Sequence, residues 1–307
     1  MNSYPNYLTF SELSKNPTFT EQFFQTEVKI EKNKVFYPKN RSLEPYFSNE
    51  FDSQKFGAAQ FLGFLHDTIA VEHNIVIPAI RDLHLLPIEV PQTPLEDLYK
   101  LVTDEGHHAA QALTFINAIK DLFHLEVYEK DKEMPLFLRK LFDKKEFLET
   151  ERDIAIFNMI IGVVTETRIS KELGLFTNDE LINSAVVDNC RSHQEDEVVH
   201  ASQFRALGKW SWENFNDRQR EIVAKIYAET TIARSYPDID RLGFYFSQAS
   251  GINRNESRKI ISEVYTQDVL MEEMLLAARP TIAFLKNLGI LDYSSATQTL
   301  KSAGIEV

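Results

Sequence analysis

The stretch Asp196-Glu197-Val198-Val199-His200 repeats a spacing that occurs earlier in the chain as Asp104-Glu105-Gly106-His107-His108. Residues three apart share one face of a helix, so the glutamate and the histidine of each copy can reach one metal ion. Each aspartate precedes the histidine of its own copy by one turn. We expect it to accept the hydrogen bond of that imidazole's outward N–H. Chance alone gives only ~0.04 copies of the pattern Asp-Glu-x-x-His in a chain of this composition, so two copies indicate a metal site.

Four long segments carry the apolar spacing of amphipathic helices. Each has about 30 residues, or about 40 Å of helix, which suits a four-helix bundle. The low content of glycine and proline, 10 and 11 of 307 residues, also favours long helices over an all-β architecture. The predicted segments are 53–83, 94–123 with Thr93 as the N-cap, 145–173 ending at Gly174, and 178–207 ending at Gly208.

Shorter helical patterns flank these four segments. They lie near residues 10–24, 135–142, 217–235, 256–276 and 280–288. Because no linker composition interrupts residues 53–288, we expect a single all-α domain over residues 1–307. Its parts are an N-terminal arm (1–50), a metal-binding four-helix bundle (53–208) and additional flanking helices (217–290).

One carboxylate lies near the middle of the apolar face of each long segment: Glu72, Glu105, Glu166 and Glu197. A lone ionised carboxylate in a core costs several kcal/mol unless it is paired or bound to a metal, and four at one depth repel each other. A cluster of cations at the centre of the bundle would remove both problems. Glu72 and Glu166 therefore supply single carboxylates beside the two Glu-x-x-His pairs, a pattern known from di-iron carboxylate bundles.

His193 shares a helix face with Glu197 and His200, at spacings of four and seven residues. The six-ligand pattern does not need this histidine. Its functional interpretation is a seventh, nitrogen ligand on one metal, and the alternative is a core histidine bonded to a neighbour.

The order Glu-x-x-His, Glu, His-x-x-x-Glu-x-x-His resembles the para-aminobenzoate N-oxygenase family. The separation of 27 residues between Glu166 and His193 is also similar, and the resemblance covers residues 54–250. It implies a ferritin-like di-iron fold with two iron ions and O₂ as co-substrate. It also implies that the catalytic metal ligands are Glu72, Glu105, His108, Glu166, His193, Glu197 and His200, with Asp104 and Asp196 supporting the ligand histidines.

The activity that this resemblance implies is N-oxygenation of a small-molecule amine, most of all an arylamine, toward a hydroxylamine, nitroso or nitro product. The alternatives are a ferritin-like ferroxidase, a di-iron C–H hydroxylase, a radical-generating ribonucleotide reductase subunit, and a helical module with a structural metal. The reductase subunit needs a redox tyrosine near a ligand, and Tyr99 lies off the ligand face. A structural site is usually tetrahedral and rarely so rich in carboxylates.

The composition of the chain restricts the kinds of molecule that it can bind. The net charge of −13 argues against nucleic acid and against an anionic membrane surface. A single cysteine, Cys190, leaves no dithiol or cluster to store electrons, so we expect an external reductase or a ferredoxin-type donor. Neither a signal peptide nor an apolar run of membrane-spanning length is visible, so we expect a cytoplasmic protein. We also expect the protein to form a homodimer.

Other residues carry weaker signals. His107 points away from the ligand face, and we interpret His66 and His73 as structural. Gly162 either leaves room for substrate or O₂ or serves helix packing. Arg234 and Arg279 either bind a substrate carboxylate or form ordinary ion pairs.

Overall fold

The computed structural model describes residues 27–130, 134–145 and 148–307. The helix predicted near residues 10–24 lies outside them. Apart from an isolated bridge between Val35 and Ile182, the regular structure of the described residues is helical, which confirms the predicted all-α fold class. The main helices are α2 (Glu50–Val71), α3 (Ile77–Arg81), α4 (Gln92–Phe123), α6 (Leu136–Lys145), α7 (Glu151–Thr177), α8 (Ser184–Asn214), α9 (Asp217–Ser235), α10 (Ile239–Ser250), α11 (Arg254–Val264), α12 (Gln267–Asn287) and α13 (Ser294–Ser302).

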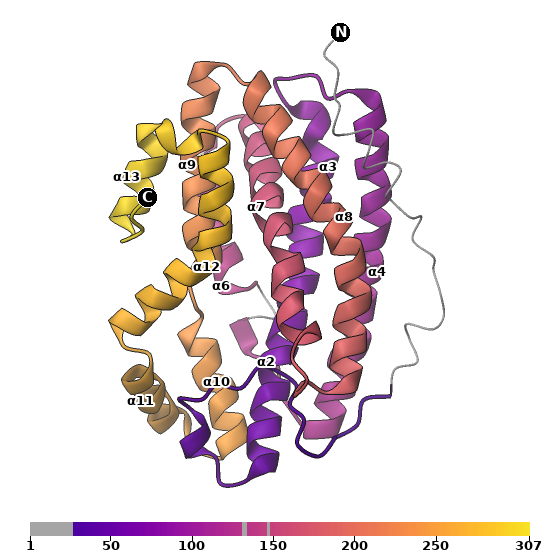
Figure 1. Ribbon diagram of the computed structural model, residues 1–307, viewed down its shortest axis with the longest axis vertical. Helices are drawn as coiled ribbons and strands as arrows, with labels where there is room; N and C mark the ends of the chain where they lie inside the picture. The colour runs from indigo at the N-terminus through magenta and orange to yellow at the C-terminus, as the bar shows by residue number, and fades with distance from the viewer. Residues whose placement is uncertain (1–26, 131–133, 146–147) are drawn as a thin grey trace.

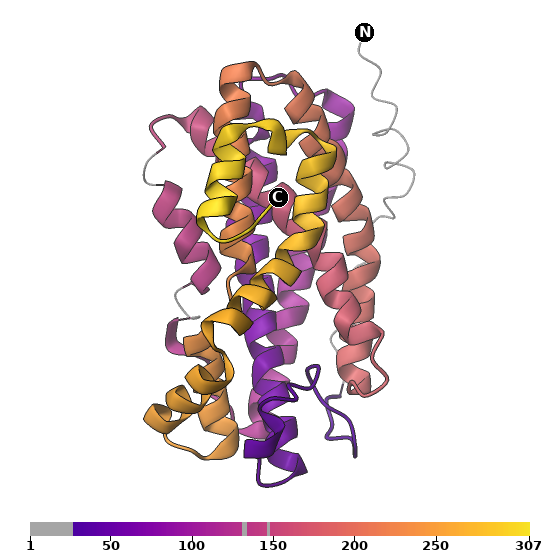
Figure 2. The same cartoon turned by 60° about the vertical axis from the view of Figure 1, so that its left-hand side comes forward.

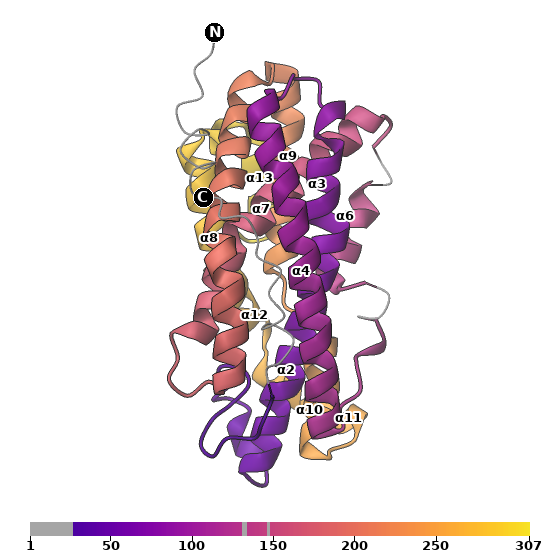
Figure 3. The same ribbon diagram turned by 90° about the vertical axis from the view of Figure 1, so that its right-hand side faces the viewer.

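The long helices α2 with α3, α4, α7 and α8 stand side by side as the predicted bundle (Figure 1). Figure 3 shows α4 and α8 on the face opposite α12. The C-terminal helices, yellow in Figure 2, cover another flank, where α12 packs against α7 and α9 and α10 packs against α2. None of the described helices is long and apolar enough to cross a membrane.

Side-chain caps explain where three of the bundle helices begin. The side chains of Asn49, Thr150 and Asn183 each accept a hydrogen bond from a backbone N–H in the first turn of α2, α7 and α8. Such caps satisfy N–H groups that have no partner within the helix. The predicted cap at Thr93 is wrong, because α4 already begins at Gln92 after Pro91.

Two predicted helix ends are also wrong. Helix α7 continues through Gly174 to Thr177, and α8 continues through Gly208 to Asn214. A Cβ at Gly208 would lie 2.8 Å from Val163 Cγ1, so the absence of a side chain at Gly208 lets α7 and α8 pack closely at this point. The predicted break between helices 256–276 and 280–288 is wrong, because α12 runs through Pro280 and the chain breaks instead at Tyr265. The sequence prediction also missed α10 and α13.

The core consists of two hydrophobic clusters at different heights of the bundle. In α7 Val163 belongs to one cluster and Ile169 to the other, with Glu166 between them. Helix α8 repeats this arrangement, with Cys190 in one cluster and Phe204 in the other. The segments between these residues carry the predicted ligands, so a polar layer separates two well-packed apolar regions.

Candidate metal centre

All seven residues predicted as metal ligands are buried in that polar layer. Their exposed fractions range from 0% for Glu105 to 6% for His193. Each of the four bundle helices contributes at least one carboxylate, because the helices place residues from the middle of their apolar stripes at a common height. The residues are Glu72, Glu105, His108, Glu166, His193, Glu197 and His200.

Two of the carboxylates lie between histidines. Glu105 places its Oε2 3.2 Å from His108 Nδ1 and its Oε1 3.1 Å from His200 Nδ1. Glu197 Oε1 accepts a hydrogen bond of 2.9 Å from His193 Nε2 and lies 3.4 Å from Nδ1 of both other imidazoles. These positions suit carboxylates that are shared between two metal ions.

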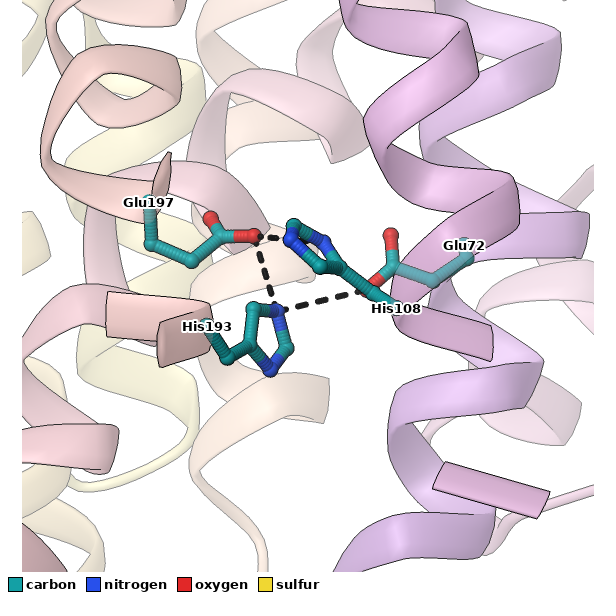
Figure 4. A group of neighbouring side chains, drawn as sticks. All are labelled: Glu72, His108, His193 and Glu197. Atoms are coloured by element: carbon teal, nitrogen blue, oxygen red, sulfur yellow. Dashed lines mark hydrogen bonds and ion pairs between the residues drawn. The ribbon is translucent and has the colours of Figure 1, made fainter. Parts of the chain in front are cut away.

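The other two carboxylates flank the layer. Glu72 Oε1 lies 3.9 Å from His193 Nε2, a contact drawn as a dashed line in Figure 4, and the Glu72 carboxyl interacts with the charge of Glu105. The Glu166 carboxyl interacts in the same way with the charge of Glu197. Each flanking carboxylate is therefore adjacent to one of the two central ones.

Two overlapping groups of these side chains could each hold a metal ion. One group is Glu72, His108, His193 and Glu197, and the other is Glu105, His108, Glu197 and His200. Within each group the donor atoms lie within 4.8 Å of one another. Carboxylate oxygen and imidazole nitrogen are donors that iron accepts readily.

The electrostatics of the metal-free layer divide the four carboxylates into two kinds. Burial and then the charge of Glu105 raise the pKa of Glu72 well above its ordinary value, and burial and Glu197 do the same to the pKa of Glu166. Burial also opposes ionisation of Glu105, but His200 and His108 outweigh it and lower the pKa of Glu105 to about 2. The layer thus favours protonation of Glu72 and Glu166 and ionisation of Glu105 and Glu197.

The histidines respond to these central carboxylates. Burial alone would lower the pKa of His108, but its bonds with Asp196 and Glu105 raise that pKa to about 9. The pKa of His200 is raised well above its usual value because the charges of Glu105 and Glu197 outweigh burial. Burial and the neighbouring His108 lower the pKa of His193. Protons therefore supply the positive charge that metal ions would supply in a loaded site.

Unsatisfied polar atoms test whether the layer fits metal ions. Glu72, Glu166 and Glu197 each keep an Oε2 atom that has no hydrogen-bond partner within the described residues, and the same holds for His200 Nδ1. Buried polar atoms are normally satisfied, and the exceptions need an explanation. Metal ions coordinated by these atoms provide one, so the donor set fits a metal centre.

The aspartates do not bond the histidines of their own helices, and this prediction is wrong. His108 Nε2 donates to Asp196 Oδ2 across the bundle, and His200 Nε2 donates to Asp104 Oδ2, both at 3.3 Å. The pairing of 104 with 200 and of 108 with 196 means that α4 and α8 run antiparallel. An aspartate one turn before the histidine on each helix then lies level with the histidine of the other.

The helix that carries Glu72 is distorted at the ligand itself. Residues Glu72–Val76 form a π-helical turn, in which the Ile77 N–H bonds to the Glu72 carbonyl. Pro78 follows two residues later, and proline lacks an N–H and clashes with the carbonyl four residues earlier in a regular helix. The wide turn adds a residue to the helix and so sets which side chains face the core. The sequence prediction read this region as a regular helix.

The side chain of Asn74, within this wide turn, bonds to the backbone just before it. Its Nδ2 donates at 2.9 Å to the Ala70 carbonyl, which the Asn74 backbone N–H would bond in a regular α-helix. Replacing Asn74 by alanine is expected to weaken metal binding by about fivefold, since one hydrogen bond contributes about 1 kcal/mol. The matched control is Asn214→Ala, whose amide also bonds a carbonyl four residues back, at 2.8 Å. Equal metal affinity in the two variants, measured by anaerobic Fe(II) titration, would contradict this role.

The weaker sequence signals have structural explanations. A Cβ on Gly162 would lie 2.8 Å from Ala79 Cβ and 2.9 Å from Phe204 Cε1, so this glycine serves helix packing. Arg234 forms an ion pair of 3.1 Å with Glu172, and Arg279 is exposed.

His107 is buried beside the layer, and burial lowers its pKa, whereas His73 is exposed and His66 is partly buried. Tyr99 is 47% exposed, away from the layer.

Comparison with known proteins identifies the family. No curated protein matches the chain. The family model described as P-aminobenzoate N-oxygenase AurF matches residues 48–289, which include all four bundle helices and every residue of the polar layer. This family consists of di-iron proteins, in agreement with the buried glutamates and histidines. The chain therefore belongs to the P-aminobenzoate N-oxygenase family.

Proposed function

We propose that the protein is a di-iron N-oxygenase that uses O₂ to oxidise an amine, most of all an arylamine, toward a hydroxylamine, nitroso or nitro product. The observation that carries the proposal is the single buried layer of four glutamates and three histidines in a chain of this family. Electrons come from an external donor, because the chain's one cysteine, Cys190, is buried alone in the core. The homodimer, the cytoplasmic location and the single-domain division stay predictions of the sequence.

The distances suggest how the ligands divide between two irons. Glu72, His108 and His193 would bind one ion and His200 the other, with Glu105 and Glu197 between them. Glu166, whose carboxyl interacts with Glu197 and His200, would join the second ion. When bound, iron that alternates between Fe(II) and Fe(III) supplies the electrons that activate O₂ for oxygen transfer to nitrogen.

The chain's own residues prepare this centre. Asp196 and Asp104 accept hydrogen bonds from the Nε2–H groups of His108 and His200, which fixes each imidazole with Nδ1 toward the central carboxylates. The two apolar clusters above and below the layer exclude water, and this protects a reactive oxidant from side reactions.

Metal binding is expected to release about two or more protons per chain at neutral pH. The raised pKa values of His108, His200, Glu72 and Glu166 favour the protonated forms of these groups, whereas metal ligands must be deprotonated. The apparent affinity for Fe(II) therefore rises with pH through the neutral range. Anaerobic calorimetric titrations in two buffers of different ionisation enthalpy measure the proton count, and a count of zero would contradict the proposed ligand set.

His193→Ala is expected to keep the fold and much of the iron but to change the absorption spectrum and activity of the oxidised site. His193 is 6% exposed and bonds Glu197, so its loss removes one nitrogen donor from an otherwise complete set. The control is His84→Ala, because His84 is exposed and remote from the layer. If spectrum and activity are unaltered, His193 is only a core histidine.

A substrate panel tests the reaction. The di-ferrous protein is mixed with O₂ under single-turnover conditions, together with an arylamine, an aliphatic amine or an alkylarene. Oxygen on the nitrogen of the arylamine supports the proposal. Oxidation confined to carbon indicates a hydroxylase, and accumulation of mineral iron without organic product indicates a ferroxidase; either would contradict it.

A further inference from the structure

The metal layer has an internal twofold pattern that relates α4 to α8. The sequence Asp-Glu-x-x-His-Ala-x-Gln occurs once in each helix, at residues 104–111 and 196–203. The two helices run antiparallel, as their crossed bonds between aspartate and histidine show. A twofold rotation across the bundle therefore carries each copy of the repeat onto the other. The layer consists of two halves, one beside each of the two apolar clusters.

The contacts of the two Glu-x-x-His pairs follow this pattern. His108 Nδ1 lies 3.4 Å from Glu197 Oε1 on the other helix, and His200 Nδ1 lies 3.1 Å from Glu105 Oε1. Within each pair the corresponding distances from Nδ1 to the glutamate are 3.2 and 3.4 Å. The two bonds to aspartate also match, at 3.3 Å each. Each of these contacts thus has a counterpart in the other half of the layer.

His193 breaks the pattern. It precedes Glu197 by four residues, and the residue four before Glu105 is Leu101. His193 Nε2 donates to Glu197 Oε1 at 2.9 Å. Leu101 is as well buried as a ligand, with 2% exposure, but a leucine side chain has no atom that binds a metal. One half of the layer therefore has a nitrogen donor that the other half lacks.

The two halves consequently offer different numbers of donors to an ion. Beside the shared central carboxylates, the first half has Glu72, His108 and His193 (Figure 4), and the second half has Glu166 and His200. An ion in the second half keeps a position that none of the described side chains fills. Non-haem iron centres that react with external ligands have open positions of this kind.

The histidine nitrogens show the same difference between the halves. His108 Nδ1 forms a hydrogen bond of 3.2 Å with Glu105, and His193 Nε2 is bonded as well. His200 Nδ1, in the second half, has no hydrogen-bond partner within the described residues. The second half is therefore the less satisfied of the two.

Gln203 adds an unsatisfied amide on this side. It follows His200 by one turn and is 2% exposed, and its Oε1 has no hydrogen-bond partner in the described part of the chain. Asp104 lies level with His200, so three residues in opposite directions along α4 and α8 bring Leu101 level with Gln203. Buried polar atoms without partners need an explanation, and a ligand at the height of Leu101 provides one.

Apolar side chains surround the second half. Leu101, Val163 and Phe204 belong to one hydrophobic cluster. Val163 precedes Glu166 by three residues and Phe204 follows His200 by four, so each lies about one helical turn from a ligand. A small molecule bound beside Leu101 is therefore shielded from water.

We propose that the metal centre is open on one side only, at the ion held by Glu166 and His200, where Leu101 takes the place of a third histidine. A small external ligand, anionic or diatomic, binds at this position on the side of Leu101 and Gln203. The inference rests on the proposed di-iron function and adds to it the side on which the centre accepts such a ligand.

Azide binding to the Co(II)-loaded protein tests this asymmetry, because azide fills open metal positions and so changes the visible spectrum of Co(II). The wild-type protein is expected to bind one azide for two Co(II) ions. Leu101→His supplies the missing nitrogen donor and is expected to keep both ions but to weaken azide binding more than about tenfold. An unchanged azide affinity in a folded Leu101→His protein with two ions would overturn the proposal.

Leu98→His is the matched control, because Leu98 is also fully buried but lies about one turn farther from the layer. Azide binding is expected to be unchanged in this variant, and a loss as large as that in Leu101→His would contradict a specific role of Leu101. His193→Leu gives a test that does not depend on a histidine inserted into the core. It opens the first half, so the ratio of azide to bound Co(II) is expected to rise from one half to one. A ratio that stays at one half would overturn the proposal.

These measurements need neither iron nor O₂, so they separate the two proposals. If azide binds as expected but no arylamine is oxidised at nitrogen, the proposed function fails and the open side remains. If arylamines are oxidised but Leu101→His changes neither azide binding nor oxidation, only the assignment of the open side fails.

Discussion

Glu197→Ala is expected to lose iron, with the content falling from two ions to less than one per chain and with N-oxygenation falling by more than about 100-fold. Its Oε1 lies 2.9 Å from His193 Nε2 and 3.4 Å from Nδ1 of His108 and His200, so this one carboxylate contacts every imidazole of the layer. Changes to groups that only support a metal ligand already cost about 10–100-fold, and the loss of a shared ligand costs more. Elemental analysis after anaerobic Fe(II) loading, followed by single-turnover assay, measures both effects.

The matched control for this change is Glu195→Ala. Glu195 lies two residues earlier on the same helix but is exposed. Glu197→Gln keeps the side-chain volume and separates loss of a ligand from loss of packing. A Glu197→Ala protein that retains two irons and full activity would show that this carboxylate is not a ligand.

Asp196→Asn is expected to weaken iron binding or activity by about 10–100-fold, and Asp104→Asn by a similar factor. An asparagine has nearly the same shape as aspartate but lacks the charge that stabilises the imidazole N–H, so packing is preserved. The control is Asp188→Asn on α8. The side chain of Asp188 is 67% exposed and forms a long ion pair of 3.7 Å with Arg191.

Each aspartate bonds the histidine of the other helix, so the two substitutions are expected to affect different imidazoles. Because His108 donates to Asp196 and His200 to Asp104, Asp196→Asn should shift the Nε2–H signal of His108 and leave that of His200 in place. Nitrogen-resolved NMR of the zinc-loaded protein reads the two imidazoles separately. A shift of His200 instead would contradict the antiparallel pairing.

The ligand set could be predicted because its signal is local. Glu and His at i and i+3 share a helix face by geometry alone, and a carboxylate in an apolar stripe requires a partner. Both facts follow from one helix at a time. His193 followed from the same reasoning, since residues 193, 197 and 200 share a face. The layer between two apolar clusters is the consequence of four such stripes packed together.

Features that depend on two helices were not predictable in this way. The partner of each aspartate depends on the antiparallel alignment of α4 and α8, which are separated by about 90 residues of chain. A pocket on the flank of the bundle likewise combines Tyr37 with residues from α2, α7 and α12, which no local pattern brings together.

Some helix boundaries failed because packing outweighed local propensity. Gly208 lies inside α8 because Val163 and Tyr227 leave no room for a side chain there, although glycine usually ends helices. Pro280 lies inside α12, and the break falls instead at Tyr265. Pro78, by contrast, was a usable signal for the distorted turn at Glu72, because proline within a helical pattern predicts a kink.

The metal content of the purified protein after anaerobic loading with Fe(II) tests the central claim most directly. Seven buried side chains, six of which form the two overlapping groups of donors, predict two iron ions per chain, removed together by a chelator and reduced in number by Glu197→Ala. One ion per chain, or none, would contradict the di-iron centre on which the proposed function depends.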